Sequence, residues 1–291
     1  MAPNSTVDVV DGQLVVSEAP GPARPKRSRR LWKVLIGIGV VVVLLIVAAV
    51  AWFFLGREEA RPVSDDQALE GFRGQGGTSS DAAGLPAAGV YTATATGTES
   101  VGIPGFDENL GPNAPVTVTH DAGDCFTYRA DFNSHYWRNW TWCPTTDATF
   151  AVTTMVSRTG RSLPGVEIES LATYTCDTPI PFLWADAAVG DQRTGSCTGV
   201  VEDSEGVTGD AAVVEVLDRT TLTVAGEEVD VIHLRSTETL SDAQTGNETD
   251  EWWIDADTGL PVRIEFGILA KGSREYTVTG TLELTTLTPA T

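Results

Sequence analysis

Beyond about residue 88 the chain consists of short runs in which apolar or β-branched residues alternate with polar ones. Examples are VYTATAT, PVTVTH, TFAVTTMV and VDVIHLRST. Such alternation is typical of strands with one buried and one solvent-facing side, and the Gly, Pro, Asp and Asn between the runs mark turns. No stretch of 88–291 keeps the helical period over three or more turns. We therefore predict one mainly β, antiparallel domain over 88–291.

The N-terminal part follows a different pattern. Val34 to Leu55 is a run of 22 residues without a charge, long enough to cross a hydrocarbon core of about 30 Å as a helix. Trp32 and Trp52 lie near its ends, where indoles prefer the membrane interface. A cleaved signal peptide is the alternative, because Ala49-Val-Ala51 resembles a cleavage site, but the apolar run is too long and the basic region begins too late.

Charge around this apolar run predicts its orientation. Six Lys and Arg residues lie between residues 24 and 33, whereas the other flank mixes both signs. The positive-inside rule therefore predicts a single-pass protein of the cell membrane with a cytoplasmic N-terminus and an extracytoplasmic C-terminal domain. The predicted organisation is a disordered cytoplasmic tail over 1–30, a transmembrane helix over 31–55, a flexible extracytoplasmic linker over 56–87 and the β ectodomain over 88–291.

The exported part is strongly acidic. From residue 56 onward, 13 Lys and Arg stand against 37 Asp and Glu. This balance disfavours nucleic acid and anionic lipid as partners, because the electrostatic repulsion would oppose their approach.

Four cysteines all lie in the exported part, and an even count in an oxidising compartment indicates two disulfides. The segment CFTYRADFNSHYWRNWTWC suggests their pairing. Folded as a hairpin about Ser134, it brings Cys125 opposite Cys143, which leaves Cys176 for Cys197. The same register gives a polar face and an aromatic face, whose predicted pairs are Phe126 with Trp142, Tyr128 with Trp140, and Phe132 with Tyr136.

Aromatic residues in this hairpin are better explained as core than as a ligand platform, because burying each ring is worth roughly 2–3 kcal/mol. Trp137 is the exception, since it falls on the polar face beside His135. An exposed tryptophan is uncommon, so Trp137 and His135 are the candidate contact residues.

Motifs for catalysis or metal binding are absent from the sequence. It has three histidines, no HExxH, no CxxC pair, no GxSxG and no SxxK. DADTG, residues 255–259, begins like a calcium loop but has glycine at the fifth position of the loop, where an oxygen ligand should stand, so we interpret it as a β-turn. We expect no metal and no cofactor.

The segment EWWIDADTGLPVRIEF, residues 251–266, resembles the strand–turn–strand hairpin of the lipoprotein-carrier half-barrels, the LolA and LppX/LprG-like group. The likeness extends over about 225–285. In that group a curved antiparallel sheet, partly closed by helices, shelters acyl chains. The resemblance therefore implies a curved antiparallel sheet, half-barrel or barrel-like, that holds a lipid. The group's helices have no evident counterpart here. The anchor and disulfides resemble membrane-anchored envelope proteins of high-GC Gram-positive bacteria.

Three functions follow from these patterns. The first is a non-catalytic module that binds a lipid or another apolar envelope ligand. The second is a structural or protein-interaction module with a filled core and no ligand. An envelope hydrolase is less favoured, because no activated nucleophile or metal constellation is visible.

Overall fold

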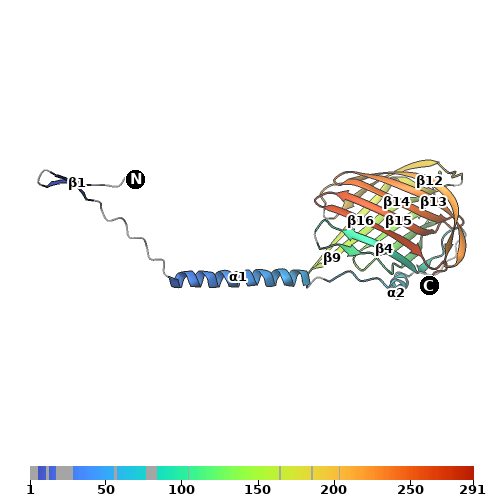
Figure 1. Ribbon diagram of the computed structural model, residues 1–291. Coiled ribbons are helices and arrows are strands. Elements are labelled where there is room, and N and C mark those ends of the chain that lie inside the picture. Colours follow the sequence, from blue (N-terminus) through green and yellow to red (C-terminus); the bar gives the residue numbers. More distant parts are fainter. Residues whose placement is uncertain are drawn as a thin grey trace. The chain divides into compact units, whose positions relative to one another are not determined.

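The computed structural model describes residues 6–10, 13–17, 29–55, 58–76, 84–103, 105–163, 165–184, 186–202 and 204–291. The chain divides into two compact units, Met1–Leu55 and Gly56–Thr291 (Figure 1). Each is described by itself.

The first unit contains a hairpin and a helix. Strands β1 (Thr6–Val10) and β2 (Gln13–Ser17) pair antiparallel, and α1 spans Arg29–Leu55. This hairpin lies within the stretch predicted as a disordered tail, where an Asp-Gly pair between two alternating runs is a strong hairpin signal. The basic residues before Arg29 lie outside the described residues. Over the part of the chain whose side chains are described, no helix has the length and hydropathy of a membrane span.

The second unit is a helix and one large sheet. Its elements are α2 (Asp65–Gly74), β3 (Gly89–Tyr91), β4 (Ala93–Ser100), β5 (Glu108–Asn109), β6 (Val116–Asp121), β7 (Cys125–Asp131), β8 (Trp137–Cys143), β9 (Phe150–Leu163), β10 (Val166–Leu183), β11 (Gln192–Val201), β12 (Thr208–Val224), β13 (Glu227–Asp242), β14 (Thr245–Asp255), β15 (Pro261–Lys271) and β16 (Glu275–Leu284). Fourteen strands form a single curved antiparallel sheet, which confirms the predicted mainly β, antiparallel fold.

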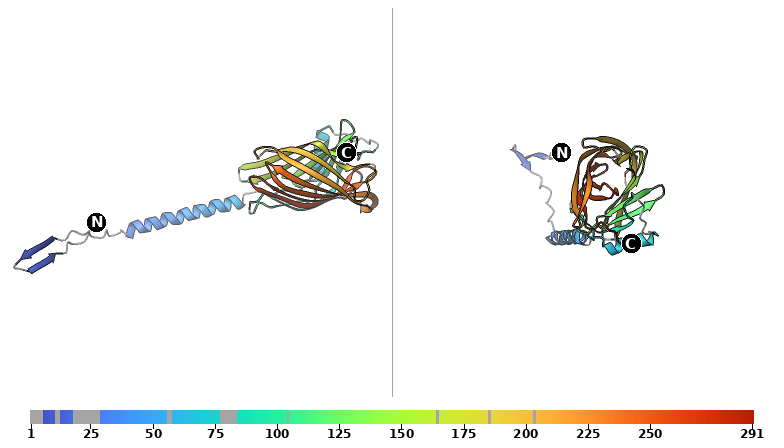
Figure 2. Two further views of the ribbon diagram at one scale, coloured as in Figure 1. Left: turned by 90° about the horizontal axis from the view of Figure 1, so that it is seen from above. Right: turned by 90° about the vertical axis from the view of Figure 1, so that its right-hand side faces the viewer.

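The order of strands shows that the sheet rolls up. β3 and β4 are separated only by Thr92, yet β3 pairs with β6 and β4 pairs with β16 at the other end of the order. On the side away from β16, where it also pairs with β5, β4 bonds to the segment before β6, through Ala95 N to Pro112 O at 3.0 Å and Ala114 N to Ala93 O at 3.1 Å. The strands therefore surround a common interior (Figure 2), and we call this unit the rolled sheet.

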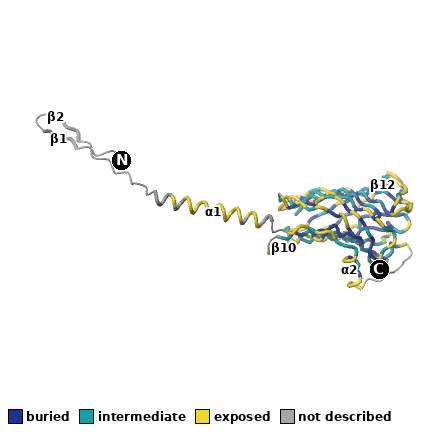
Figure 3. The backbone as a smooth tube through the Cα atoms, turned by 60° about the horizontal axis from the view of Figure 1, so that its bottom comes forward, coloured by how far each residue is buried: buried dark blue, intermediate teal, exposed yellow. Residues whose placement is uncertain are grey.

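Alternation along the strands places the core inside. In β14 every second residue from Glu248 to Ile254 is buried, and the intervening residues are partly exposed. Figure 3 shows that buried residues are concentrated in the middle of the strands, whereas exposed residues lie at the hairpin ends. The curved antiparallel sheet is compatible with the half-barrel architecture that the sequence resemblance implies.

Helix α2 lies within the stretch predicted as a flexible linker. Its first turn has a capping box between Ser64 and Gln67, a Ser-x-x-Gln pattern that marks a helix start. Phe72 is buried with Val90 of β3 in a small apolar cluster. Upstream, Arg61 N donates to Ser134 Oγ at 3.0 Å. Over 58–76 the structure thus differs from the predicted linker, because capping and one buried aromatic fix this segment on the sheet.

Candidate functional site

The aromatic hairpin has the predicted register. Phe126 pairs with Trp142, and Tyr128 pairs with Trp140, while Cys125 is bonded to Cys143. Cys176 is bonded to Cys197. Rings of the predicted pairs lie in contact, with centroids 5.7 Å apart for Phe126–Trp142, 6.0 Å for Tyr128–Trp140 and 5.1 Å for Phe132–Tyr136.

Those rings meet aromatics from the opposite wall of the rolled sheet. Trp252 of β14 contacts Trp140 and Trp142 of β8 with centroids 5.2 and 5.7 Å apart. Phe182 of β10 completes the group at 5.2 Å from Trp252. Because β8 and β14 are separated by five strands in the sheet order, these contacts cross the interior. One part of the interior is therefore filled by aromatic side chains.

Charged side chains occupy the neighbouring part of the interior. Arg138 on β8 donates from Nη2 to Glu248 Oε1 at 2.6 Å, and its Nη1 lies 3.8 Å from Asp250 Oδ2, both on β14. The same guanidinium stacks on the Trp140 ring at 4.7 Å. We name the interior carboxylate cluster as the four acidic residues that share this space, each 2–8% exposed: Asp210, Glu238, Glu248 and Asp250.

Register explains why these four carboxylates meet. Glu238 of β13 lies directly opposite Glu248 of β14, and Ser236 lies opposite Asp250. Asp210 of β12 is one row further along, opposite Leu240. Like charges directly opposite in an antiparallel pair repel, so the arrangement disfavours full ionisation.

Burial and repulsion from neighbouring carboxylates raise the pKa values of three of these groups. Desolvation, with the neighbouring Glu248 charge second, raises the pKa of Asp210 to about 7 and the pKa values of Glu238 and Asp250 well above their ordinary range. Tyr174 of β10 faces the same cluster, and burial raises its pKa to about 12.

A second charged network joins β9 to the opposite wall. Arg161 Nη1 contacts Glu99 Oε2 at 3.0 Å and Glu108 Oε2 at 3.3 Å, while its Nε donates to the carbonyl of Phe106 at 3.2 Å. Glu99 is fully buried, and desolvation raises its pKa to about 7 against the opposing effect of Arg161. These bonds hold the β4–β5 connection against the sheet.

His135, one of the two predicted contact residues, belongs to this second network. It is buried, and its Nδ1 lies 2.9 Å from Glu108 Oε1. It is therefore not part of an open polar face beside Trp137.

Trp137, the other predicted contact residue, lies on the outer face of β8 and is half-buried. The Arg129 guanidinium lies over its ring at 4.1 Å and is held by Asp131 at 2.7 Å. Arg158 of β9 is its neighbour on the other side. The ring is thus partly covered by the Arg129 guanidinium.

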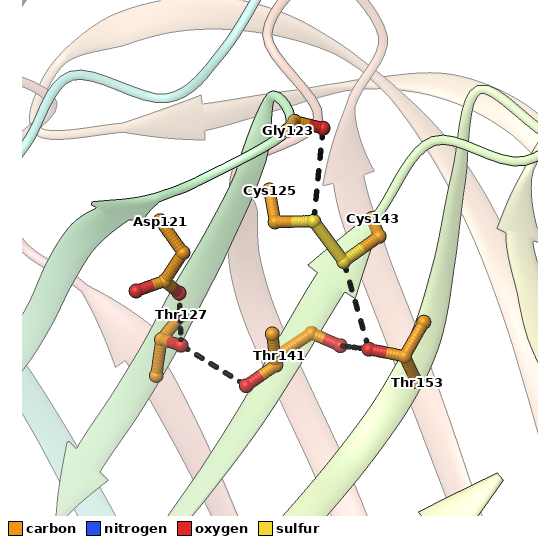
Figure 4. The surroundings of a disulfide bond; sticks show 7 residues. All are labelled: Asp121, Gly123, Cys125, Thr127, Thr141, Cys143 and Thr153. Atoms are coloured by element: carbon orange, nitrogen blue, oxygen red, sulfur yellow. Dashed lines mark hydrogen bonds between the residues drawn. A yellow bond between two sulfur atoms is a disulfide. The ribbon is translucent and has the colours of Figure 1, made fainter.

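The outer face of the hairpin carries the first disulfide and a line of threonines (Figure 4). Thr127 donates to Asp121 Oδ2 at 2.7 Å, so that the Thr141 hydroxyl, 3.0 Å away, donates to Thr127. Thr153 donates to the Thr141 carbonyl at 3.2 Å and lies 3.6 Å from Cys143 Sγ. Because both sulfurs are oxidised and the hydroxyls bond to one another, this strip is structural.

A shallow depression of about 400 Å³ lies on the outer face of β14, β15, β16 and β4. It is lined by Thr96, Thr279, Thr281 and two carboxylates, Glu251 and Glu265. Glu251 is bound by Arg235 at 2.7 Å and by His233 at 2.9 Å, and Glu265 is bound by Arg263. Both carboxylates of the depression are therefore already paired within the sheet.

The DADTG segment forms a turn, as the sequence analysis predicted. Asp255 Oδ1 accepts from Asp257 N at 2.8 Å and from Thr258 N at 3.2 Å, and Gly259 has a φ of 75°. Among the described residues, no group of three or more His, Cys, Asp and Glu side chains is placed to hold a metal ion.

Sequence reasoning missed both interior networks, although a signal was present. Glu248 and Asp250 have the same parity along β14 as Trp252 and Ile254, so a strict alternation places all four side chains inside.

Comparison with known proteins gives no family: no protein-family model, no curated protein and no solved structure matches this chain.

Proposed function

We propose that this chain is a single-pass membrane protein whose extracytoplasmic rolled sheet is a non-catalytic module with a filled interior. The module acts by binding a protein partner on its outer surface. The observation that carries the proposal is the set of contacts across the interior, Trp140–Trp252 at 5.2 Å and Arg138–Glu248 at 2.6 Å.

These contacts occupy the space that a carried acyl chain would need. Phe132 and Phe266 also meet across the interior, with centroids 5.1 Å apart. Apolar ligand sites are concave and largely preformed, whereas these opposite walls touch through side chains that are fully or almost fully buried. A filled interior supports a role for the outer surface.

Membrane anchoring is supported by sequence. The uncharged run Val34–Leu55 falls within helix α1, and the basic residues precede it. The acidic balance of the part from residue 56 onward favours a basic partner, because a strong field of one sign accelerates the approach of the opposite sign.

Lipid carriage is the second candidate, and the curvature of the sheet favours it. In a carrier, the acyl chain would enter among the interior aromatics. Both functions share the anchor and the export of the domain, and what the interior holds distinguishes them.

Quenching of tryptophan fluorescence by a brominated fatty acid separates the two functions. The full-length chain with Trp32→Phe and Trp52→Phe, reconstituted in nanodiscs, retains six tryptophans, all in the rolled sheet. We expect no saturable quenching, because Trp140, Trp142 and Trp252 pack against protein. Saturable quenching that reaches these buried rings would establish lipid carriage and reject the filled-interior module.

The partner-binding half of the proposal has its own test. A photoreactive phenylalanine analogue at Trp137 in cells should crosslink to one basic envelope protein. The same analogue at Glu228, an exposed position on β13, is the matched control. Equal labelling at both positions, or labelling at neither, contradicts binding through the Trp137 face.

A further inference from the structure

The interior carboxylate cluster has more acid than base. Its four carboxylates come from β12, β13 and β14, whereas Arg138 of β8 is the cation that contacts it. The other titratable groups that face the cluster are the phenols Tyr174 on β10 and Tyr136 just before β8. Beyond Tyr136, Tyr276 on β16 interacts with Tyr136, with Arg138 and with Glu99 on β4.

Strand pairing gives a second, geometric observation. Glu238 lies directly opposite Glu248, and one buried oxygen each of Asp210 and Asp250 accepts no hydrogen bond from a described residue. An ionised carboxylate only accepts hydrogen bonds, so two adjacent buried carboxyl groups can bond to each other only when one of them carries a proton. Arg138 is directed at the interior carboxylate cluster. Its buried Nη1 has no hydrogen-bond partner among the described residues and lies 3.8 Å from Asp250 Oδ2.

We propose that the interior carboxylate cluster is a proton-operated latch that joins β12, β13 and β14 to Arg138 on the opposite wall. With protons bound, carboxyl groups bond to one another and Glu248 remains as the counter-ion of Arg138. When the protons leave, the carboxylates repel across the Glu238–Glu248 pair. The hairpin β13–β14 then moves away from β8. This inference concerns the interior and does not depend on the partner proposed for the outer face.

The direction of the pH effect follows from proton linkage. The unfolded carboxyls titrate near pH 4, whereas burial raises the pKa of Asp210 to about 7 in the fold and raises the pKa values of Glu238 and Asp250 well above their ordinary range. The folded state therefore holds more protons than the unfolded state above about pH 4. The stabilisation is complete below the unfolded pKa and is lost as pH rises through the folded values. For each extra proton that the folded state holds, the unfolding equilibrium constant rises about tenfold with every unit of increase in pH within this window.

Hydrogen exchange and urea unfolding of the full-length chain in nanodiscs test the latch. After correction for intrinsic exchange rates, amides of β13 and β14 should exchange at least tenfold faster at pH 8 than at pH 5.5, while the amides of β7 change less. Glu238→Gln keeps the shape and removes one titrating group. It should lower the slope of the logarithm of the unfolding constant against pH by about one, the contribution of one proton. It should also slow hydrogen exchange of the β14 amides at pH 8.

Glu228→Gln is the matched control, because Glu228 is exposed on the same strand, and it should leave the slope unchanged. Asp210→Asn provides a second variant if Glu238→Gln does not fold, with the same expected loss of slope. A domain that is more stable at pH 8 than at pH 5.5, or a slope that both variants leave intact, would overturn the proposal. Native mass spectrometry that shows a small cation retained in place of the protons would overturn it as well.

Discussion

Replacing Trp140 by alanine removes a ring that lies between two walls of the rolled sheet. Trp140 is 2% exposed. Its ring contacts Tyr128 on the neighbouring strand, Trp252 across the interior at 5.2 Å and the Arg138 guanidinium at 4.7 Å. Deleting a buried tryptophan costs about 3–5 kcal/mol. We expect the upper part of this range, because the rings on both sides lose their partner and Arg138 loses its stacking surface.

Trp137→Ala is the matched comparison on the same strand. Trp137 lies on the outer face, so its replacement removes the contact with Arg129 at 4.1 Å and the packing of the buried part of its ring. A cation–π contact at such a site is worth about 0.5–1 kcal/mol, and we expect the free energy of unfolding to fall by about 1 kcal/mol in total. Urea unfolding followed by near-ultraviolet circular dichroism measures both variants. Equal losses for Trp137→Ala and Trp140→Ala would refute the assignment of opposite faces.

Two other perturbations test the interior and the disulfides. Replacing Cys125 and Cys143 by serine should lower the free energy of unfolding by about 3 kcal/mol, because an 18-residue separation is no longer closed in the unfolded chain; an unchanged urea midpoint would contradict this. Arg161→Met leaves Glu99 and Glu108 without their cation and should cost about 3–5 kcal/mol at pH 8, whereas Arg158→Met, which breaks a more exposed pair with Glu169, should cost less than about 1 kcal/mol. Because the pKa of Glu99 is about 7, the loss in Arg161→Met should be smaller at pH 5, and equal losses at the two pH values would count against a buried Glu99 charge.

Local pattern was sufficient to predict the hairpin of Cys125–Cys143. Its register depends on residues within one short segment, where the turn, the aromatic alternation and the cysteine spacing all agree. The second disulfide then followed by elimination. The DADTG turn was predictable for the same reason, since Asp255 and Gly259 act on their own backbone.

Closure of the sheet depends on long-range pairing, which the sequence pattern does not contain. β3 and β4 read as one run, VYTATAT, and only the pairing of β3 with β6 and of β4 with β16 shows that this run joins both ends of the sheet. Helix α2 was missed because it is short and falls in a stretch read as a linker, although its Ser-x-x-Gln start was visible.

The interior charges were missed because a polar residue in an amphipathic strand is taken to face solvent. That assumption fails where the interior itself contains polar partners from another wall. Arg138 interrupts the buried face of β8 two residues before Trp140, and Asp250 likewise comes two residues before Trp252 on β14. The two interruptions occur at matching heights on opposite walls, which is why Arg138 lies 3.8 Å from Asp250 and 2.6 Å from Glu248. A charged residue at core parity on one strand is costly by itself, but complementary interruptions on two strands indicate that those strands face each other across the interior.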